Sequence, residues 1–299
     1  MGRHARDVAL VAAHELVETV QTRLVWIVLL AYAGGVGFSG WLFVRVLREA
    51  ERGVAEAMGV PPTDRPGALT GALLERGDID AILGPLTGGR VGTDLLHEPL
   101  IALWTGAFAQ GLLPVVVLFT AAGSVGAQVS NRAIRYLACR TGRAEIGLGK
   151  LVGQLLVAAT AAALGAAVVW VLAMVLMVEQ PPVATAWALV DRALRALAYT
   201  LPWCGLGMAV SMWVPSANAA RAVAAVLFLA MNIGAGLLDE RVDDSFAGRA
   251  ADLALLFLPT DSWTMFWTEG DLGAGVARCV VLGLGFYAIG HARFARVDL

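Results

Sequence analysis

Long apolar runs alternate with short charged segments along this chain of 299 residues. Residues 99–131 and 151–178 contain no Asp, Glu, Lys or Arg, and other apolar stretches hold at most one such residue. About 20 apolar residues in a helix cross the roughly 30 Å hydrocarbon core of a bilayer. The pattern therefore predicts six transmembrane helices, at about 24–44, 99–128, 151–178, 196–214, 219–238 and 272–291.

The composition indicates the same class of protein. Hydrophobic residues make up 58% of the chain, charged residues only 15%, and the mean hydropathy is +0.71. We expect an all-α integral membrane protein whose membrane domain covers residues 24–299. The first run is not expected to be a cleaved signal peptide, because 23 residues precede it and no small-x-small site follows before Arg45.

The arginines and the single lysine indicate the orientation. Segments 1–23, 129–150, 215–221 and 291–299 hold 11 Arg and Lys in 61 residues, compared with 11 in the 112 residues of segments 45–98, 178–195 and 239–278. With the carboxylates included, the two sides are net +6 and −8, which gives the overall −2. By the positive-inside rule, both termini are predicted to be cytosolic.

The first 23 residues show helical periodicity. Apolar side chains recur along one face at Val8, Val11, Leu16 and Val20, opposite a face that includes Asp7 and His14. The pattern predicts an amphipathic helix lying in the cytosolic membrane interface. A short cytosolic helix packed on other protein has the same pattern, and periodicity does not separate the two.

Two segments on the predicted outer side are longer than a simple connection. The acidic segment 45–98 is long enough to form a cap that touches an extracytoplasmic protein or a substrate, although solvated filler explains it equally well. Segment 239–271 holds an apolar stretch too short to cross a bilayer, followed by Trp263, Phe266 and Trp267. This composition predicts a pair of short surface or re-entrant helices anchored by interfacial aromatic rings.

Candidate chemistry is sparse. The four histidines are scattered and no local motif places a catalytic set, so we predict neither a metal site nor catalytic residues. Residues 144–151 resemble a phosphate-binding loop only superficially, since the first glycine and the final Ser or Thr are missing. The uncharged polar residues available to line a pathway are Gln110, Gln128, Gln154 and Asn232, although hydrogen bonds between helices explain such residues as well.

The segment between the second and third predicted spans has a recognisable pattern. Residues 135–150 read RYLACRTGRAEIGLGK, a basic turn followed by Glu145-Ile146 and by Gly149-Lys150 at the start of the next span. This string and the six-span topology resemble the permease subunits of ABC-2-type ABC transporters. The chain departs from the family pattern at residues 129–132 and at Thr141-Gly142, where many members have Gly-Thr and a proline.

The resemblance implies a function and a set of partners. The chain would form the membrane pathway of an ATP-driven exporter in the bacterial cytoplasmic membrane, together with a second permease copy or paralogue. Two cytosolic ABC ATPase subunits would bind ATP and Mg and dock on segment 129–150, so the chain itself would bind no cofactor and no nucleic acid. The residues implied in this coupling are Arg132, Arg135, Tyr136, Arg140, Thr141, Arg143, Glu145 and Lys150.

A second function from another class fits the same sequence. A membrane scaffold that anchors an ATPase and transmits force to an extracytoplasmic protein also needs the coupling segment, but moves no solute. Such a protein would depend on the 45–98 loop, whereas an exporter depends on a continuous route through its spans.

Overall fold

The computed structural model describes residues 3–21, 23–59, 61, 66–67, 98–126, 128, 141–177, 181–239, 246–267 and 271–296. Within these ranges the chain is helical or in turns and has no strand, which confirms the all-α class. The helices are α1 (Arg3–Gln21), α2 (Arg23–Met58), α5 (Leu100–Ser124), α8 (Arg143–Leu176), α9 (Pro182–Trp213), α10 (Ala217–Asp239), α11 (Phe246–Leu255), the 3-10 helix η2 (Pro259–Trp267) and α12 (Leu272–Phe294).

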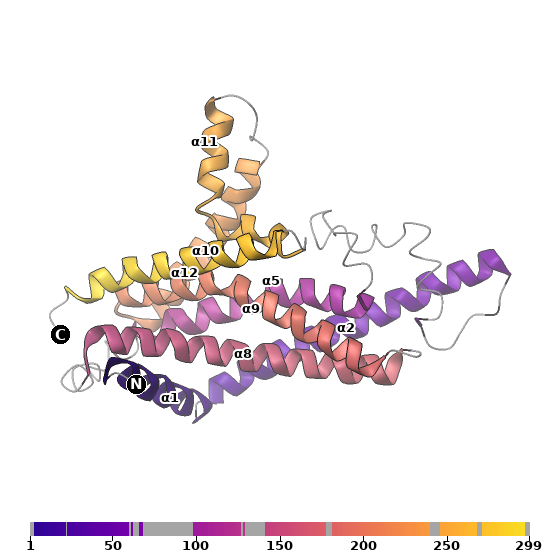
Figure 1. The fold of residues 1–299 in the computed structure, drawn as a ribbon, viewed down its shortest axis with the longest axis horizontal. Coiled ribbons are helices and arrows are strands. Elements are labelled where there is room, and N and C mark those ends of the chain that lie inside the picture. The colour runs from indigo at the N-terminus through magenta and orange to yellow at the C-terminus, as the bar shows by residue number, and fades with distance from the viewer. Residues whose placement is uncertain are drawn as a thin grey trace.

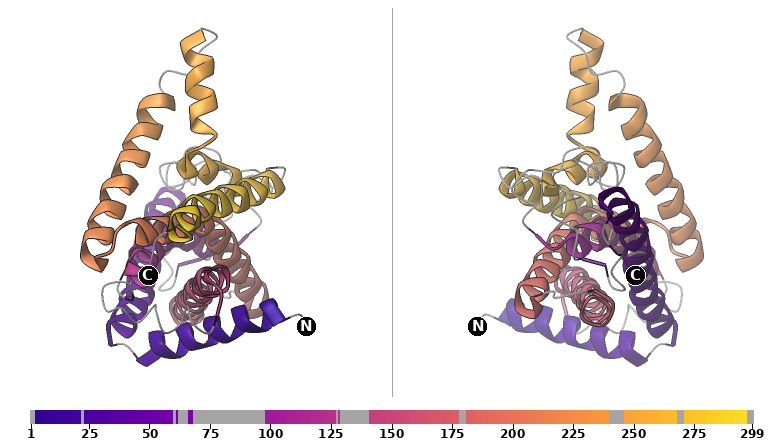
Figure 2. Two further views of the ribbon diagram at one scale, coloured as in Figure 1. Left: turned by 90° about the vertical axis from the view of Figure 1, so that its left-hand side faces the viewer. Right: turned by 90° about the vertical axis from the view of Figure 1, so that its right-hand side faces the viewer.

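Five of these helices run along the long axis of a bundle: α2, α5, α8, α9 and α12 (Figure 1). The N- and C-terminal ends of the chain lie at the same end of this bundle, which we call the termini end (Figure 1). Helix α1 crosses the bundle there, while α10 and α11 stand off from it as an arm (Figure 2).

Five described helices are long and apolar enough to cross a membrane. They are α2, α5, α8, α10 and α12, and they correspond to five of the six predicted spans. The remaining predicted span, 196–214, covers the second half of α9, which ends at Trp213, contains Asp191, Arg192 and Arg195 and does not meet this test. The structure therefore supports a multi-pass membrane protein, and the sixth crossing stays a prediction.

Helix α9 lies in the middle of the bundle, where it packs against α5, α8 and α12. This position permits it to carry polar side chains. Two glycines on α9 allow this close packing. A Cβ at Gly205 would collide with the carbonyl of Gly283 on α12, and one at Gly207 would lie 2.8 Å from the Leu118 oxygen on α5. Side chains on a helix enclosed by protein can meet polar partners that hydrocarbon does not offer.

Helix boundaries differ from the predicted span boundaries at two places. Helix α2 continues past residue 44 to Met58, and ends at Gly59, whose φ of 67° is favourable for glycine in a helix C-cap. Helix α8 begins at Arg143, so the last residues of the predicted segment 129–150 form its first turns. Residues 129–140 and 68–97 lie outside the described residues.

Segment 239–271 contains α11 and η2, and Arg278 of α12 holds them in place. Its guanidinium pairs with Asp261 at 2.5 Å and donates to the carbonyls of Leu255, Leu256 and Leu258. These carbonyls lie at the C-terminal end of α11 and just beyond it, where the helix dipole favours a cation. An arginine near the end of a span commonly extends towards water, whereas the Arg278 side chain caps the C-terminal end of α11.

The glycine contacts between α9 and α12 lead to a testable difference between two positions on one helix. A Cβ at position 283 would lie 2.8 Å from the Leu201 oxygen, whereas position 285 has open space around it. We expect Gly283→Ala to cost about 1–3 kcal/mol, the range for overpacking a close contact. Thermal unfolding in mild detergent, followed by tryptophan fluorescence, measures the difference.

Gly285→Ala is the matched control, since it makes the same chemical change two residues away. We expect its melting temperature to equal or slightly exceed that of the unmodified chain, because alanine is the better helix former. Equal destabilisation by both substitutions would contradict the close packing of α9 and α12.

Candidate coupling site

Three segments far apart in the sequence meet at the termini end: α1, the start of α8 and the end of α12 (Figure 1). Arg143, in the first turn of α8, donates from Nη1 to the carbonyls of Ala295, at 2.7 Å, and Phe294, at 3.4 Å. The last carbonyls of a helix have no partner inside it, and the helix dipole favours a cation beside them. Arg143 therefore attaches the end of α12 to the start of α8.

The same turn of α8 also holds the N-terminal end of α1. Nδ1 of His4 lies 2.6 Å from Oε1 of Glu145. Glu145 is in the first turn of α8, where the helix dipole stabilises a negative charge. The contact is at the surface, since the His4 side chain is 89% exposed, so it orients α1 more than it stabilises the fold.

A buried ion pair lies two turns further along α8. Nζ of Lys150 is 2.5 Å from Oε2 of Glu15 on α1, and the two side chains are only 2% and 9% exposed. Gln154 lies on the same side and its Nε2 is 3.5 Å from the other carboxylate oxygen of Glu15. A buried charge is costly without a partner, so each member of the pair requires the other.

Two glycines let α1 lie close enough to α8 for this pair to form. A Cβ at Gly149 would lie 2.5 Å from the Cβ of Val11 and 3.1 Å from the Val8 oxygen. A Cβ at Gly153 would lie 2.9 Å from Cγ of Glu15. Helix α1 therefore packs on a surface of α8 that is formed by Gly149, Lys150 and Gly153.

The structure describes four of the eight residues predicted to couple the chain to an ATPase. Arg143, Glu145 and Lys150 contact other elements of the same chain, and Thr141 precedes α8. The other four, Arg132, Arg135, Tyr136 and Arg140, lie outside the described residues. Their role stays a prediction, while Arg143, Glu145 and Lys150 belong to the junction of α1, α8 and α12.

Sequence reasoning missed the partners of these residues. No role at this junction was expected for His4, Glu15 or Gly153. Each contacts a residue more than 130 positions away in the chain, and helical periodicity does not predict which helices pack together. One signal was present. The sequence places a lysine, Lys150, between the small residues Gly149 and Gly153, and it places a carboxylate, Glu15, on the helix predicted before the first span.

Helix α1 turns its predicted apolar face to the protein. Val8 and Val11 lie against Gly149 of α8, and Leu16 packs on the main core of the bundle. The side chain of Val20, the fourth predicted member, is not among those described. Leu10 and Val17 are exposed on other sides of the helix. Contact with α8 explains the predicted face, and the placement of α1 in a membrane interface stays a prediction.

The predicted pathway residues have separate environments. Gln110 on α5 is buried and donates from Nε2 to the carbonyl of Trp263 at 3.2 Å. Asn232 is exposed on α10 and donates to the Phe228 carbonyl of its own helix. Gln128 is half-buried beyond the end of α5, and its Oε1 atom has no partner among the described residues. A role in a pathway stays a prediction for all three.

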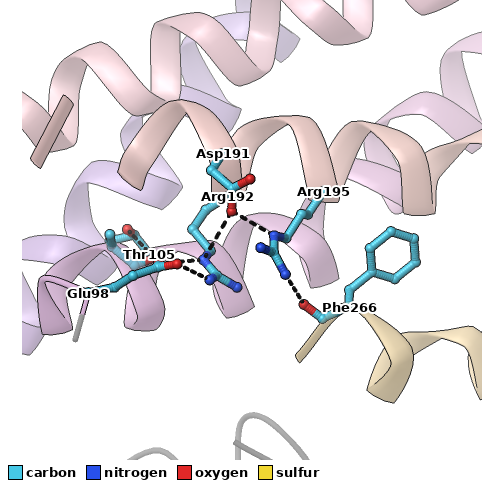
Figure 3. A network of polar contacts seen from close by, with 7 residues as sticks. Glu98, Thr105, Asp191, Arg192, Arg195 and Phe266 are labelled. Carbon is cyan, nitrogen blue, oxygen red and sulfur yellow. Dashed lines mark hydrogen bonds and ion pairs between the residues drawn. The ribbon is translucent and has the colours of Figure 1, made fainter. Parts of the chain in front are cut away.

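A second polar cluster, which we call the ionic layer, joins α9 to the residue before α5 and to η2 (Figure 3). Arg192 on α9 makes a two-pronged contact with Glu98, which precedes α5, with N–O distances of 2.5 and 2.9 Å. Arg195 pairs with Asp191 at 2.6 Å and donates to the carbonyl of Phe266 in η2 at 3.1 Å. Two positive and two negative groups balance, so the layer attaches α9 to the start of α5 and to η2 without a net charge.

The polar contacts at the two ends of the bundle join helices to one another. Among the described residues, no group of three or more His, Cys, Asp or Glu side chains is placed to hold a metal ion. At the termini end, side chains in the first turns of α8 contact both α1 and the end of α12. A displacement of the chain just before Arg143 would be passed to α8 directly, and to α1 and α12 through the three contacts.

Comparison with known proteins agrees with this membrane architecture. The sequence model of the family described as ABC-2 family transporter protein matches residues 9–299. No curated protein matches the chain significantly. The family match includes the junction at α8 and all the described helices except the first residues of α1.

The buried pair between Glu15 and Lys150 predicts a characteristic double-mutant result. Glu15→Leu or Lys150→Met alone should destabilise the folded chain by about 3–5 kcal/mol, because each leaves one buried group without its partner. The double variant Glu15→Leu with Lys150→Met should be close to the unmodified chain, since apolar residues of similar size replace both groups. Thermal unfolding of the four proteins in detergent gives the comparison.

Glu56→Gln removes a carboxylate from an exposed position on α2 and serves as the control. We expect it to leave the melting temperature unchanged. A double variant as unstable as the two single variants added together would show that the ion pair is not what holds α1 on α8.

Proposed function

Because the chain belongs to the ABC-2 family of transporter proteins, we propose that it is the permease subunit of an ATP-driven exporter. In this proposal it forms the membrane pathway and a separate nucleotide-binding subunit hydrolyses ATP. The observation that supports coupling is the junction at the termini end, where the first turns of α8 are attached to both α1 and α12.

The proposed topology has six spans with both termini in the cytosol. Helix α9 would be the sixth crossing, since it returns the chain to the termini end after α8 has left it (Figure 1). An even number of crossings agrees with the two chain ends lying together. The excess of arginine in segments 1–23, 129–150 and 291–299 assigns that end to the cytosol, in what we propose is a bacterial cytoplasmic membrane.

The proposed mechanism is a rigid-body rock of the spans. Two ATPase subunits, with ATP and Mg bound to them, would dock on the basic segment 129–142 of two permeases, each a copy of this chain or a paralogue. Closure of the ATPases would push the start of α8. Since Arg143 and Lys150 attach that start to α12 and α1, the three helices would move together.

A charge-reversal experiment tests the docking part of this proposal. Arg135→Glu with Arg140→Glu changes two arginines that precede α8 and avoids Arg143, which is attached to α12. We expect loss of the copurifying ATPase, or loss of transport-coupled ATP hydrolysis, because reversal of both charges should disrupt docking that depends on the basic character of this segment. Affinity purification from the native host followed by an ATPase assay makes the measurement.

Arg293→Glu with Arg296→Glu is the matched control. Both arginines are exposed at the same end of the chain but lie outside the coupling segment. If the positive charges serve only to orient the protein in the membrane, the two double variants should behave alike. Full ATPase binding and full coupling in the Arg135/Arg140 variant would remove the proposed docking segment.

Deletion of residues 61–92 separates export from the scaffold alternative. The deletion leaves α2 intact and ends before Glu98, so it spares the ionic layer. An exporter should keep substrate-stimulated ATPase activity in reconstituted vesicles, because its route runs between spans. A protein that only transmits force to an extracytoplasmic partner should keep basal ATPase binding and lose its effect on that partner.

A further inference from the structure

An apolar groove runs between α8 and α9, two helices that lie side by side in the bundle (Figure 1). Its volume is about 350 Å³, and none of the twelve residues that line it is charged. Seven of them are alanines, whose short side chains leave this space between the two helices. Val190 and Leu194 also line the groove and are 42% and 59% exposed, so it opens to the surroundings of the bundle.

The length of the groove matches one leaflet of a bilayer. Since α9 runs back along α8, Trp170 and Ala186 line the end of the groove away from the termini end, and Ala159 and Leu197 line the other. The two ends are 11 residues apart on each helix, which is about 16 Å at a rise of 1.5 Å per residue. The hydrocarbon core of a bilayer is roughly 30 Å thick, so each leaflet supplies about half of that.

Tryptophan side chains place the first of these ends at the membrane surface. Trp170 lines the groove there, and its Nε1 donates to the carbonyl of Pro182, at the start of α9, at 3.0 Å. Trp187, next to Ala186, is 69% exposed. Tryptophan rings are enriched at the depth of the lipid head groups. The groove therefore begins at the membrane interface and leads into the hydrocarbon of one leaflet.

The width of the groove separates the occupants that an apolar surface can have. A volume of about 350 Å³ over about 16 Å gives a mean cross-section of about 20 Å². A helix with its side chains is about 10 Å across and needs about 80 Å², so the body of a helix from another chain does not fit. A hydrocarbon chain packed at carbon–carbon separations of about 4 Å needs roughly 16 Å². The groove has room for one such chain.

We propose that this groove binds one acyl chain of a phospholipid in the outer leaflet. The head group lies beside Trp170 and Trp187, and the chain runs past the α8 alanines towards Leu197. Protein surrounds this chain on several sides, so it makes more dispersion contacts than a lipid on a convex helix surface and stays longer. The inference goes beyond export, and it rests on the topology proposed above only for the choice of leaflet.

Photo-crosslinking of the full chain in native membrane vesicles tests this proposal. A phosphatidylglycerol with a diazirine midway along one acyl chain is exchanged into the accessible leaflet of right-side-out or inside-out vesicles, and mass spectrometry identifies the labelled residues. In right-side-out vesicles, we expect labelling of Val190 and Leu194 to exceed that of Val281 and Ile289 at least about fivefold, because the groove retains its lipid. Val281 and Ile289 on α12 are the more exposed pair, at 69% and 60%.

A variant that fills the groove supplies the second measurement. Ala163→Leu with Ala167→Leu enlarges two lining residues that are exposed, so the fold should tolerate both changes. We expect this variant to reduce the labelling of the two α9 positions to the level of α12. Ala277→Leu with Ala288→Leu makes the same change at exposed positions on α12 and should leave the groove labelling unchanged.

Three results would overturn the proposal. Equal labelling of the groove and of α12 in the unmodified chain would show ordinary lipid contact only. A groove protected from the probe in both kinds of vesicle would show that protein covers it. Groove labelling from inside-out vesicles alone would overturn the outer leaflet together with the proposed orientation. None of these readouts depends on ATP hydrolysis, which the charge-reversal experiment tests separately.

Discussion

The absence of hydrogen-bond partners in hydrocarbon determines most of this structure. Backbone groups in a bilayer must be satisfied within the chain, which leaves helices as the element for each crossing, and polar side chains are tolerated where protein surrounds them. Arg192 and Arg195 illustrate the second requirement. Both lie on α9, at the centre of the bundle, where Glu98, Asp191 and the Phe266 carbonyl meet their guanidinium groups.

The same constraint explains which parts of the fold could be predicted from the sequence. A helix that crosses hydrocarbon needs a long apolar run, so α2, α5, α8, α10 and α12 are visible as uncharged or nearly uncharged runs. Helix α9 is a weaker sequence signal because it carries Asp191, Arg192 and Arg195, and the arginines find partners on other segments of the fold. The first span is expected to end at residue 44 because charged residues begin at Arg45, but charge ends a membrane span and not a helix, and α2 continues without a break to Met58.

The sequence predicted the α8 residues of the candidate site but not their partners on α1. Glu145 and Lys150 belong to a local motif, and a motif can be found from residues that are neighbours in the chain. Their partners His4 and Glu15 lie on α1, and the pairing depends on how closely Gly149 and Gly153 let that helix approach. Periodicity identifies the apolar face of α1 but does not say whether lipid or another helix covers it. Only the packing of α1 on α8 answers that question.

The contacts between helices limit the motion that the proposed coupling could produce. In that mechanism, a push on the start of α8 would move α1 and α12 with it, because Lys150 and Arg143 attach them to α8. The close contact of Gly283 with Gly205 would pass the movement to α9, and the ionic layer would carry the start of α5 and η2 along with α9. The bend at residues 214–216, which contains Pro215, separates this connected set of helices from α10.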